Sequence, residues 1–227
     1  MVKCQAQHEI VDCRRCNRLT VYRERVAQEK VRRFRDQEYW GRPVPSLGPG
    51  NARLLIVGLA PAAHGGNRTG RVFTGDRSGD WLYRALHRFG FANQPNSTDR
   101  NDGLRLIDCY ITAAVHCAPP DNKPTPEEFV NCRPYFIEEL RALKNVHVVV
   151  PLGLIGFKTY FGARKELGWE NPSPLPQFAH SAVALLADGV YVVSSYHPSQ
   201  QNTQTGKLTE AMFDDVFRKA RKRIDSA

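Results

Sequence analysis

Three short and largely apolar runs in the middle of the chain constrain its fold more than any other feature. They lie at residues 54–57, 106–115 and 146–151, and loops rich in Gly, Pro or polar residues bound them. Runs of this kind are typical of strands buried on both faces, as in a parallel sheet covered by helices. Residues 182–186 and 190–195 are also expected to be strands, joined across an Asp-Gly turn.

Helical patterns separate these strands. Residues 125–128 (TPEE) place Thr as the N-cap, Pro at the first helical position and Glu three residues after the cap, which predicts a helix from there to about Lys144. Residues 79–89 and 153–163 are further predicted helices. The C-terminal segment has an apolar stripe made of Leu208, Met212, Phe213, Val216, Phe217 and Ala220. Alternating strands and helices predict an α/β domain of three layers (α/β/α), with a central, mainly parallel four-stranded sheet.

The N-terminal part is of a different kind. Residues 17–38 are rich in charge and sparse in apolar positions, which predicts a helix lying on the surface. A Gly/Pro loop at 41–50 follows, and it is too short to separate two domains. We therefore expect a single domain over residues 1–227, with an N-terminal extension at 1–50 and an α/β core at 51–227.

The charge of the chain points to an anionic partner. The 32 Lys and Arg against 23 Asp and Glu give a net charge of +9 in 227 residues, and residues 1–53 and 207–227 supply +6 and +2 of it. Such an excess favours nucleic acid as the partner. No run of 18 apolar residues exists, and the N-terminus lacks the apolar stretch of a signal peptide. We expect a cytoplasmic protein with no membrane contact.

Six cysteines in such a compartment raise the question of a metal site. Cys13 and Cys16 form a C-x₂-C pair, and Cys117 and Cys132 follow about a hundred residues later. A pair and two distant thiolates can hold zinc or a four-iron cluster, and the spacing does not separate the two. Unligated buried thiols and a redox pair are the alternatives. The other two cysteines are Cys109, which lies within an apolar run, and Cys4, which could compete as a ligand.

Ligands bind beyond the carboxyl ends of strands in open α/β sheets, so the loops at these positions are candidates for the site. Three loops qualify: the long, Gly-rich loop at 58–76, the loop at 116–126, and the loop at 194–200, which places a His at a strand end. The chain has neither a P-loop nor a Gly-x-Ser-x-Gly elbow, which weakens nucleotide hydrolysis and acyl transfer as functions.

The ordered set of motifs resembles the uracil-DNA glycosylase superfamily in its iron–sulfur branches, over about residues 13–225. The motifs are Cys13-x₂-Cys16, GLAPA at 58–62, RVFTGDRSG at 71–79, PPDNKP at 119–124 between Cys117 and Cys132, and YHPS at 196–199. Leu59 and the stretch HGGNRTGRVFTGD at 64–76 are similar to family 5 in particular.

The resemblance implies a role for each motif. Phe73 would stack on an extruded base, and His197 would donate a hydrogen bond to the base carbonyl on which negative charge grows. Asp76 and Asn122 would position or polarise the attacking water. The pocket floor would be formed by Gly58, Leu59, Ala60 and Pro61. A structural [4Fe–4S] cluster would be held by Cys13, Cys16, Cys117 and Cys132.

Two departures from the wider superfamily affect the expected substrate range. Most branches carry an acidic or amide residue where this chain has Leu59, and family 4 has an Asn at the position aligned with Ala113. A less polar pocket wall relaxes base recognition, so we expect uracil, hypoxanthine and other damaged bases as substrates. Gln200 and the polar residues after it stand where many relatives place an apolar wedge, which leaves the intercalating residue open.

The resemblance therefore implies a monofunctional DNA glycosylase, a monomer whose partner is DNA containing uracil or other damaged bases. The charge and the cysteines alone would also suit a non-catalytic DNA-binding protein with a structural metal site, or a redox protein. Asp76 could equally be a helix N-cap, and Asn122 a turn residue.

Overall fold

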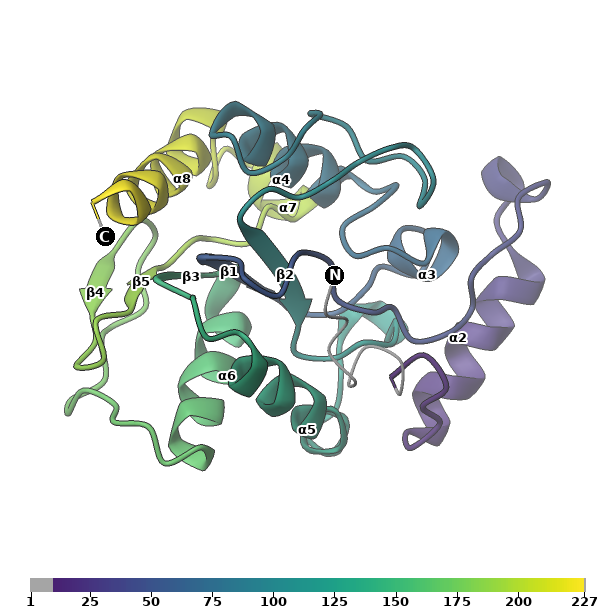
Figure 1. The fold of residues 1–227 in the computed structure, drawn as a ribbon. Helices are drawn as coiled ribbons and strands as arrows, with labels where there is room; N and C mark the ends of the chain where they lie inside the picture. Colours follow the sequence, from purple (N-terminus) through teal and green to yellow (C-terminus); the bar gives the residue numbers. More distant parts are fainter. Residues whose placement is uncertain (1–9, 227) are drawn as a thin grey trace.

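The computed structural model describes residues 10–226, and a five-stranded sheet lies at its centre (Figure 1). Its order is β2-β1-β3-β5-β4. The strands are β1 (Leu54–Gly58), β2 (Cys109–Ala113), β3 (Val148–Pro151), β4 (Val183–Leu185) and β5 (Tyr191–Val193). Every residue of β1, β2 and β3 is buried, as their unbroken apolar runs predict.

The sheet has one strand more than the four predicted for it, and the additional strand is the predicted strand segment at 182–186. The neighbours β2, β1, β3 and β5 all pair in parallel and form the expected four-stranded parallel sheet. A fifth strand, β4, pairs antiparallel with β5 and forms one edge of the sheet. The turn before β5 allows this hairpin, and β4 leaves Val183 and Leu185 exposed.

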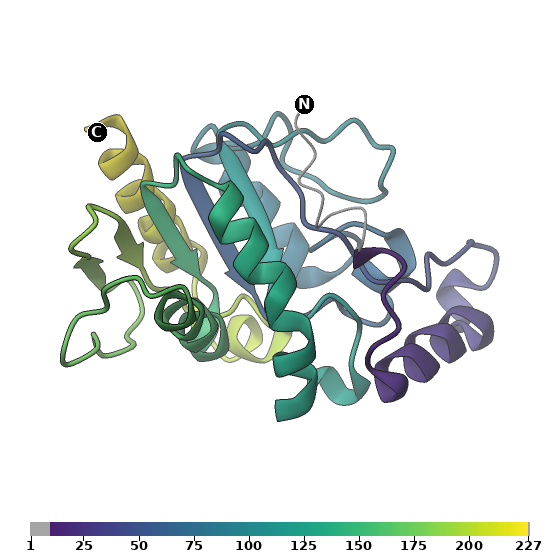
Figure 2. The same ribbon diagram turned by 60° about the horizontal axis from the view of Figure 1, so that its bottom comes forward.

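Helices cover both faces of the sheet and make the three layers that the sequence predicts (Figures 1 and 2). Helices α4 (Arg77–Arg88) and α8 (Glu210–Asp225) pack on one face over one apolar core. Helices α5 (Pro126–Ala142) and α6 (Gly153–Glu166) pack on the other face over a second core. The capping box of α5 is present: Thr125 Oγ1 accepts the Glu128 N–H at 3.4 Å, and the Glu128 carboxylate accepts the Thr125 N–H at 2.7 Å.

The N-terminal helix is shorter and less superficial than predicted. Helix α2 covers Asn17–Glu29 and ends where Lys30 adopts a φ of +50°; a 3₁₀ turn, η1 (Arg32–Phe34), follows. Its apolar residues are few, but Leu19 and Val26 are buried, so one face of the helix packs on the core. Short elements that were not predicted occur within the loops: α3 (Gly66–Thr69), η2 (Pro120–Asn122) and α7 (Gln200–Gln204).

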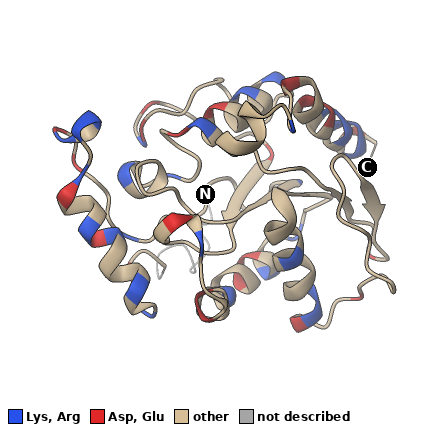
Figure 3. Ribbon diagram, turned by 180° about the vertical axis from the view of Figure 1, so that it is seen from behind, with Lys and Arg blue, Asp and Glu red and all other residues tan. Residues whose placement is uncertain are grey.

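The two basic ends of the chain lie apart. Lys and Arg mark both α2 and α8, which stand on opposite sides of the molecule (Figure 3). Of these two helices, only α2 lies on the side of the Gly-rich loop at 58–76. The basic residues of the N-terminal and C-terminal ends therefore do not form a single positively charged surface. Within residues 10–226, no helix is both long and apolar enough to cross a membrane.

Candidate active site and cysteine pocket

A pocket of about 380 Å³ opens at the carboxyl ends of the parallel strands. Its lining comes from the loops that follow β1, β2 and β5, as expected for an open α/β sheet. The lining residues are Leu59, Ala60, Pro61, Ala62, Val72, Phe73, Asp76, Arg77, Ser78, Ala113, Asn122, His197, Ser199 and Gln200. Eight of the nine predicted catalytic and substrate-binding residues are among them. Gly58, the ninth, lies directly beneath the Phe73 ring, because a Cβ at Gly58 would come within 2.9 Å of that ring.

Phe73 and His197 face the pocket together. Their ring centroids are 6.0 Å apart, with an angle of 30° between the planes. Phe73 has a φ of +50°, which is uncommon for a residue with a bulky side chain. The glycine at position 58 leaves room for the ring, so a residue without a side chain lies beneath the strained Phe73.

His197 lies in the loop that follows β5. Burial lowers the pKa of its imidazole from the usual value to about 4, so the ring is neutral at pH 7. The Asn202 side chain donates to the His197 carbonyl at 2.9 Å, which ties the backbone of this residue to α7. A neutral imidazole in this position can donate one N–H to a ligand in the pocket.

Asp76 is both an N-cap and a pocket residue, so the two interpretations of this side chain coexist. Its Oδ1 accepts the N–H of Gly79 at 3.0 Å and caps α4. Burial raises the pKa of Asp76, although the Gly79 N–H opposes that shift. Its Oδ2 lies over Gly65, where a Cβ would approach to 2.2 Å, so the Gly-rich loop gives the carboxylate its space.

Asn122 differs from the other pocket residues. It is exposed, lies at the end of η2 and has a φ of +55°. Its neighbour Asp121 is also left-handed, with a φ of +53°. Asn122 is therefore a rim residue in a tight turn, which fits the predicted turn as well as a role in water positioning.

A larger groove of about 1090 Å³ continues from the pocket toward η1. The two share Ala62, Asp76, Arg77, Asn122 and Gln200. The groove also contains aromatic and basic residues that sequence reasoning did not single out: Tyr22, Arg33, Phe34, Arg68 and Trp81. Tyr22, Arg33 and Phe34 come from the charged segment at 17–38, and Arg68 lies within the HGGNRTGRVFTGD motif, whereas Trp81 had no signal in the sequence.

The four predicted cysteine ligands line one separate, mostly apolar pocket. Cys16 is the N-cap of α2, Cys132 lies within α5, and Cys117 follows β2. Cys109 is buried in β2 and does not line the pocket, as predicted; Cys4 lies outside the described residues. Within residues 10–226, no group of three or more His, Cys, Asp or Glu side chains has the arrangement that holds a single metal ion.

Hydrogen-bond donors reach two of these thiols. Arg23 is 2% exposed, and its Nη1 donates to the Cys117 Sγ at 2.8 Å. The His116 N–H donates to the Cys132 Sγ at 3.4 Å. Burial raises the pKa of Cys117 to about 11, against the opposing charge of Arg23, and it also raises the pKa of Cys132. Four thiols, two of them with donors aimed at their sulfurs, are a donor set for a soft metal centre, either zinc or an iron–sulfur cluster, and not for a hard cation.

Comparison with known proteins places the chain in a class. The family model described as the uracil DNA glycosylase superfamily matches residues 45–221, most of the chain. The chain therefore belongs to the uracil-DNA glycosylase superfamily, and its three-layer fold is the one that the resemblance implies.

Within that superfamily the chain is similar to the type-5 branch. It is 54% identical over 215 residues to the type-5 uracil-DNA glycosylase of Mycobacterium leprae, over 94% of this chain and 92% of the relative. It is 49% identical over 213 residues to the type-5 enzyme of Thermus thermophilus, over 92% and 93%. A type-4 enzyme of Pyrobaculum aerophilum is 35% identical over 122 residues, about half of each chain. The predicted resemblance to family 5 is thus confirmed.

Proposed function

We propose that this chain is a monofunctional DNA glycosylase that hydrolyses the N-glycosidic bond of uracil, and of deaminated bases such as hypoxanthine, and leaves an abasic site. The observation that carries the proposal is the single pocket at the strand ends that collects eight of the nine predicted residues. Membership of the superfamily and the names of the type-5 relatives support the same reaction.

The pocket would receive a base rotated out of the duplex, since a base inside the stack cannot be reached. Phe73 would stack on one face of that base. Leu59 and Ala113 present apolar walls, so few hydrogen bonds would select one base over another. This lack of polar groups supports a substrate range that extends beyond uracil.

Bond cleavage moves an electron pair from the glycosidic C–N bond onto the base. His197, neutral because of its burial, would donate an N–H to the carbonyl oxygen on which this charge accumulates. The sugar becomes oxocarbenium-like as the base leaves. A neutral imidazole is a very weak acid, so its N–H would stabilise the departing anion by a hydrogen bond without transferring its proton to the base.

Water completes the reaction. Its oxygen bonds to the anomeric carbon, and its protons are shared between the new hydroxyl and the released base, so that atoms and charge balance. Asp76, when ionised, would accept a hydrogen bond from this water and stabilise the positive charge on the sugar. Asn122, on the rim, would hold the water from the other side.

Cys13, Cys16, Cys117 and Cys132 would hold a [4Fe–4S] cluster with a structural role. When bound, the cluster would supply four strong bonds between the N-terminal extension and the core. Arg23, which donates to the Cys117 Sγ, would offset part of its negative charge. The donor set and the convergence of the four cysteines on one pocket support this assignment.

The test is base release from oligonucleotides that contain a single uracil or hypoxanthine, with alkali cleavage at the abasic site as the readout. We expect release of both bases. His197→Ala should lower the single-turnover rate by about 10²–10³-fold, the usual effect of losing one such donor. The matched control is His87→Ala, an exposed histidine on α4, which should keep the wild-type rate. No abasic site with either oligonucleotide would refute the proposed function.

A further inference from the structure

The turn that carries Phe73 is held in place by a buried polar network. The left-handed φ of Phe73 persists only if the surrounding structure fixes it. The Val72 carbonyl, just before it, accepts the Tyr83 hydroxyl at 2.8 Å and the Thr74 hydroxyl at 3.1 Å. After the turn, the first residues of α4 come so close that a Cβ at Gly79 would lie 1.7 Å from the Phe73 carbonyl oxygen.

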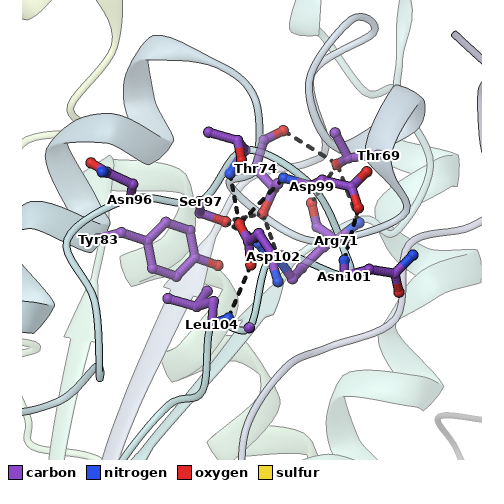
Figure 4. A network of polar contacts seen from close by, with 12 residues as sticks. Thr69, Arg71, Thr74, Tyr83, Asn96, Ser97, Asp99, Asn101, Asp102 and Leu104 are labelled. Atoms are coloured by element: carbon purple, nitrogen blue, oxygen red, sulfur yellow. Dashed lines mark hydrogen bonds and ion pairs between the residues drawn. The ribbon is translucent and has the colours of Figure 1, made fainter.

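Arg71 connects this turn to a second loop (Figure 4). Its side chain is 6% exposed; Nε donates to the Thr74 hydroxyl at 3.0 Å, and Nη2 donates to the Ser97 hydroxyl at 2.7 Å. Thr74 and Ser97 are also bonded to each other at 2.6 Å. The guanidinium therefore bonds to both sides of the contact between residues 71–75 and the loop that begins at Ser97.

Asp102 is the anion that completes the network. Its Oδ2 accepts from Arg71 Nη2 at 2.6 Å, and its side chain is 12% exposed. The same carboxylate accepts the backbone N–H groups of Thr98 at 2.8 Å, Asp99 at 3.3 Å and Leu104 at 3.0 Å. One carboxylate thus organises the loop at 97–104 and holds Arg71 in a single orientation.

We propose that Arg71 and Asp102 are positioning residues for base excision, which fix the strained turn of Phe73 so that its ring faces the pocket before the base arrives. This inference rests on the proposed function of Phe73 as a stacking residue. Neither Arg71 nor Asp102 lines the pocket of Leu59, Phe73, Asp76 and His197, called the base pocket from here on, so they act on base release only through the residues that they hold. Those residues are the turn of Phe73 and the loop at Ser97 and Thr98, which lines the adjoining groove, and the double-mutant cycle below tests whether the turn is the route. Preorganisation of this kind spares the enzyme the cost of ordering the loop during the reaction.

The first test replaces the anion. Asp102→Asn keeps the shape of the side chain but removes the charge that holds Arg71. We expect the single-turnover rate of uracil release to fall by about 10²-fold, the effect of a small misplacement near the chemistry. Affinity for undamaged DNA should not change. The matched control is Asp188→Asn. Asp188 pairs at 2.7 Å with Arg164, another buried arginine, and lies before β5, at the opposite end of that strand from His197. It should keep the wild-type rate.

A double-mutant cycle separates positioning from general destabilisation. If Asp102 acts through the ring, Asp102→Asn will have little further effect in a Phe73→Ala background, because the group that it positions is gone. If the two losses multiply, the proposal is overturned. Should Asp102→Asn fail to fold, Ser97→Ala removes one hydroxyl of the same network and undergoes the same cycle.

Hydrogen exchange gives a readout that does not depend on the reaction. Asp102→Asn should increase exchange in the peptide covering residues 71–79 more than elsewhere, whereas Asp188→Asn should not. Unchanged exchange in 71–79 would overturn the proposal even if the rate falls. A wild-type protein that releases no base would instead refute the proposed function, and the exchange result would still decide whether the network fixes the turn.

Discussion

The base pocket and the cysteine pocket are built in opposite ways. In the cysteine pocket, regular helices hold two of the four thiols: Cys16 caps α2 and Cys132 lies inside α5. In the base pocket, irregular loops hold the main side chains, and two of these residues, Phe73 and Asn122, have left-handed backbones.

This difference bears on what each pocket can do. Helices place two of the thiols without strain, and the lining of the pocket is mostly apolar. The base pocket keeps about 380 Å³ open and depends on Arg71 and Asp102 outside it to hold its strained turn. The cysteine pocket is therefore expected to act on stability, and the base pocket on the rate.

The largest expected effect comes from Cys132→Ala. Loss of one ligand should release the cluster, and loss of a structural metal centre costs more than about 4 kcal/mol of unfolding free energy. For a chain of this size we expect Tm to fall by roughly 10 °C or more. Visible absorbance and bound iron, measured on the anaerobically purified protein, should be lost at the same time.

Cys109→Ala is the matched control, because Cys109 is buried in β2 outside the cysteine pocket. It should keep its iron and lose only about 1 kcal/mol, as for an ordinary small core change. If Cys132→Ala retains iron and Tm, the cluster assignment is wrong. Zinc in place of iron in the wild-type protein would keep the structural role but change the metal.

The same contrast explains which parts of the fold and of the site could be predicted from the sequence. Buried apolar runs and the capping box before Pro126 predicted the sheet and α5, because local patterns determine such elements. Motif resemblance predicted the residues that meet in the base pocket. The edge strand β4 was not counted in the sheet, and α2 ends nine residues early. The left-handed turns and the Arg71–Asp102 pair were also missed, because they depend on contacts between distant loops.

A smaller effect is expected in the pH dependence of base release. Burial raises the pKa of Asp76. As the pH falls, the carboxylate is therefore protonated at a higher pH than an ordinary aspartate. The rate should then fall about tenfold per pH unit below that point. His197, whose pKa is lowered to about 4, is neutral at any pH well above that value, so no inflection is expected near the ordinary histidine value.

Asp76→Asn should abolish the acid limb and most of the rate but leave stability intact. In the folded state the raised pKa means that Asp76 binds its proton more tightly than in the unfolded chain, so its ionisation lowers stability as pH rises. Asn removes that penalty and remains a good N-cap. Glu138→Gln, an exposed carboxylate on α5 that lines neither the pocket nor the groove, should keep both rate and profile. A lower Tm for Asp76→Asn would mean that this carboxylate mainly supports the fold.

The smallest effect concerns the groove that leads from the base pocket to η1. Arg33 lines this groove, whereas Lys222 lies on α8, on the opposite side of the molecule. If the groove follows the DNA backbone, Arg33→Gln should weaken binding of all sequences alike, by less than about tenfold, and reduce the slope of log K against log salt by about one. Lys222→Gln removes the same charge and should leave the slope unchanged.

Because both variants lower the net charge of +9 equally, a difference between their slopes reports the location of the charge and not its amount. Equal slopes would mean that the two basic ends attract DNA only through their overall field, and the groove would then lose its assignment as a backbone contact.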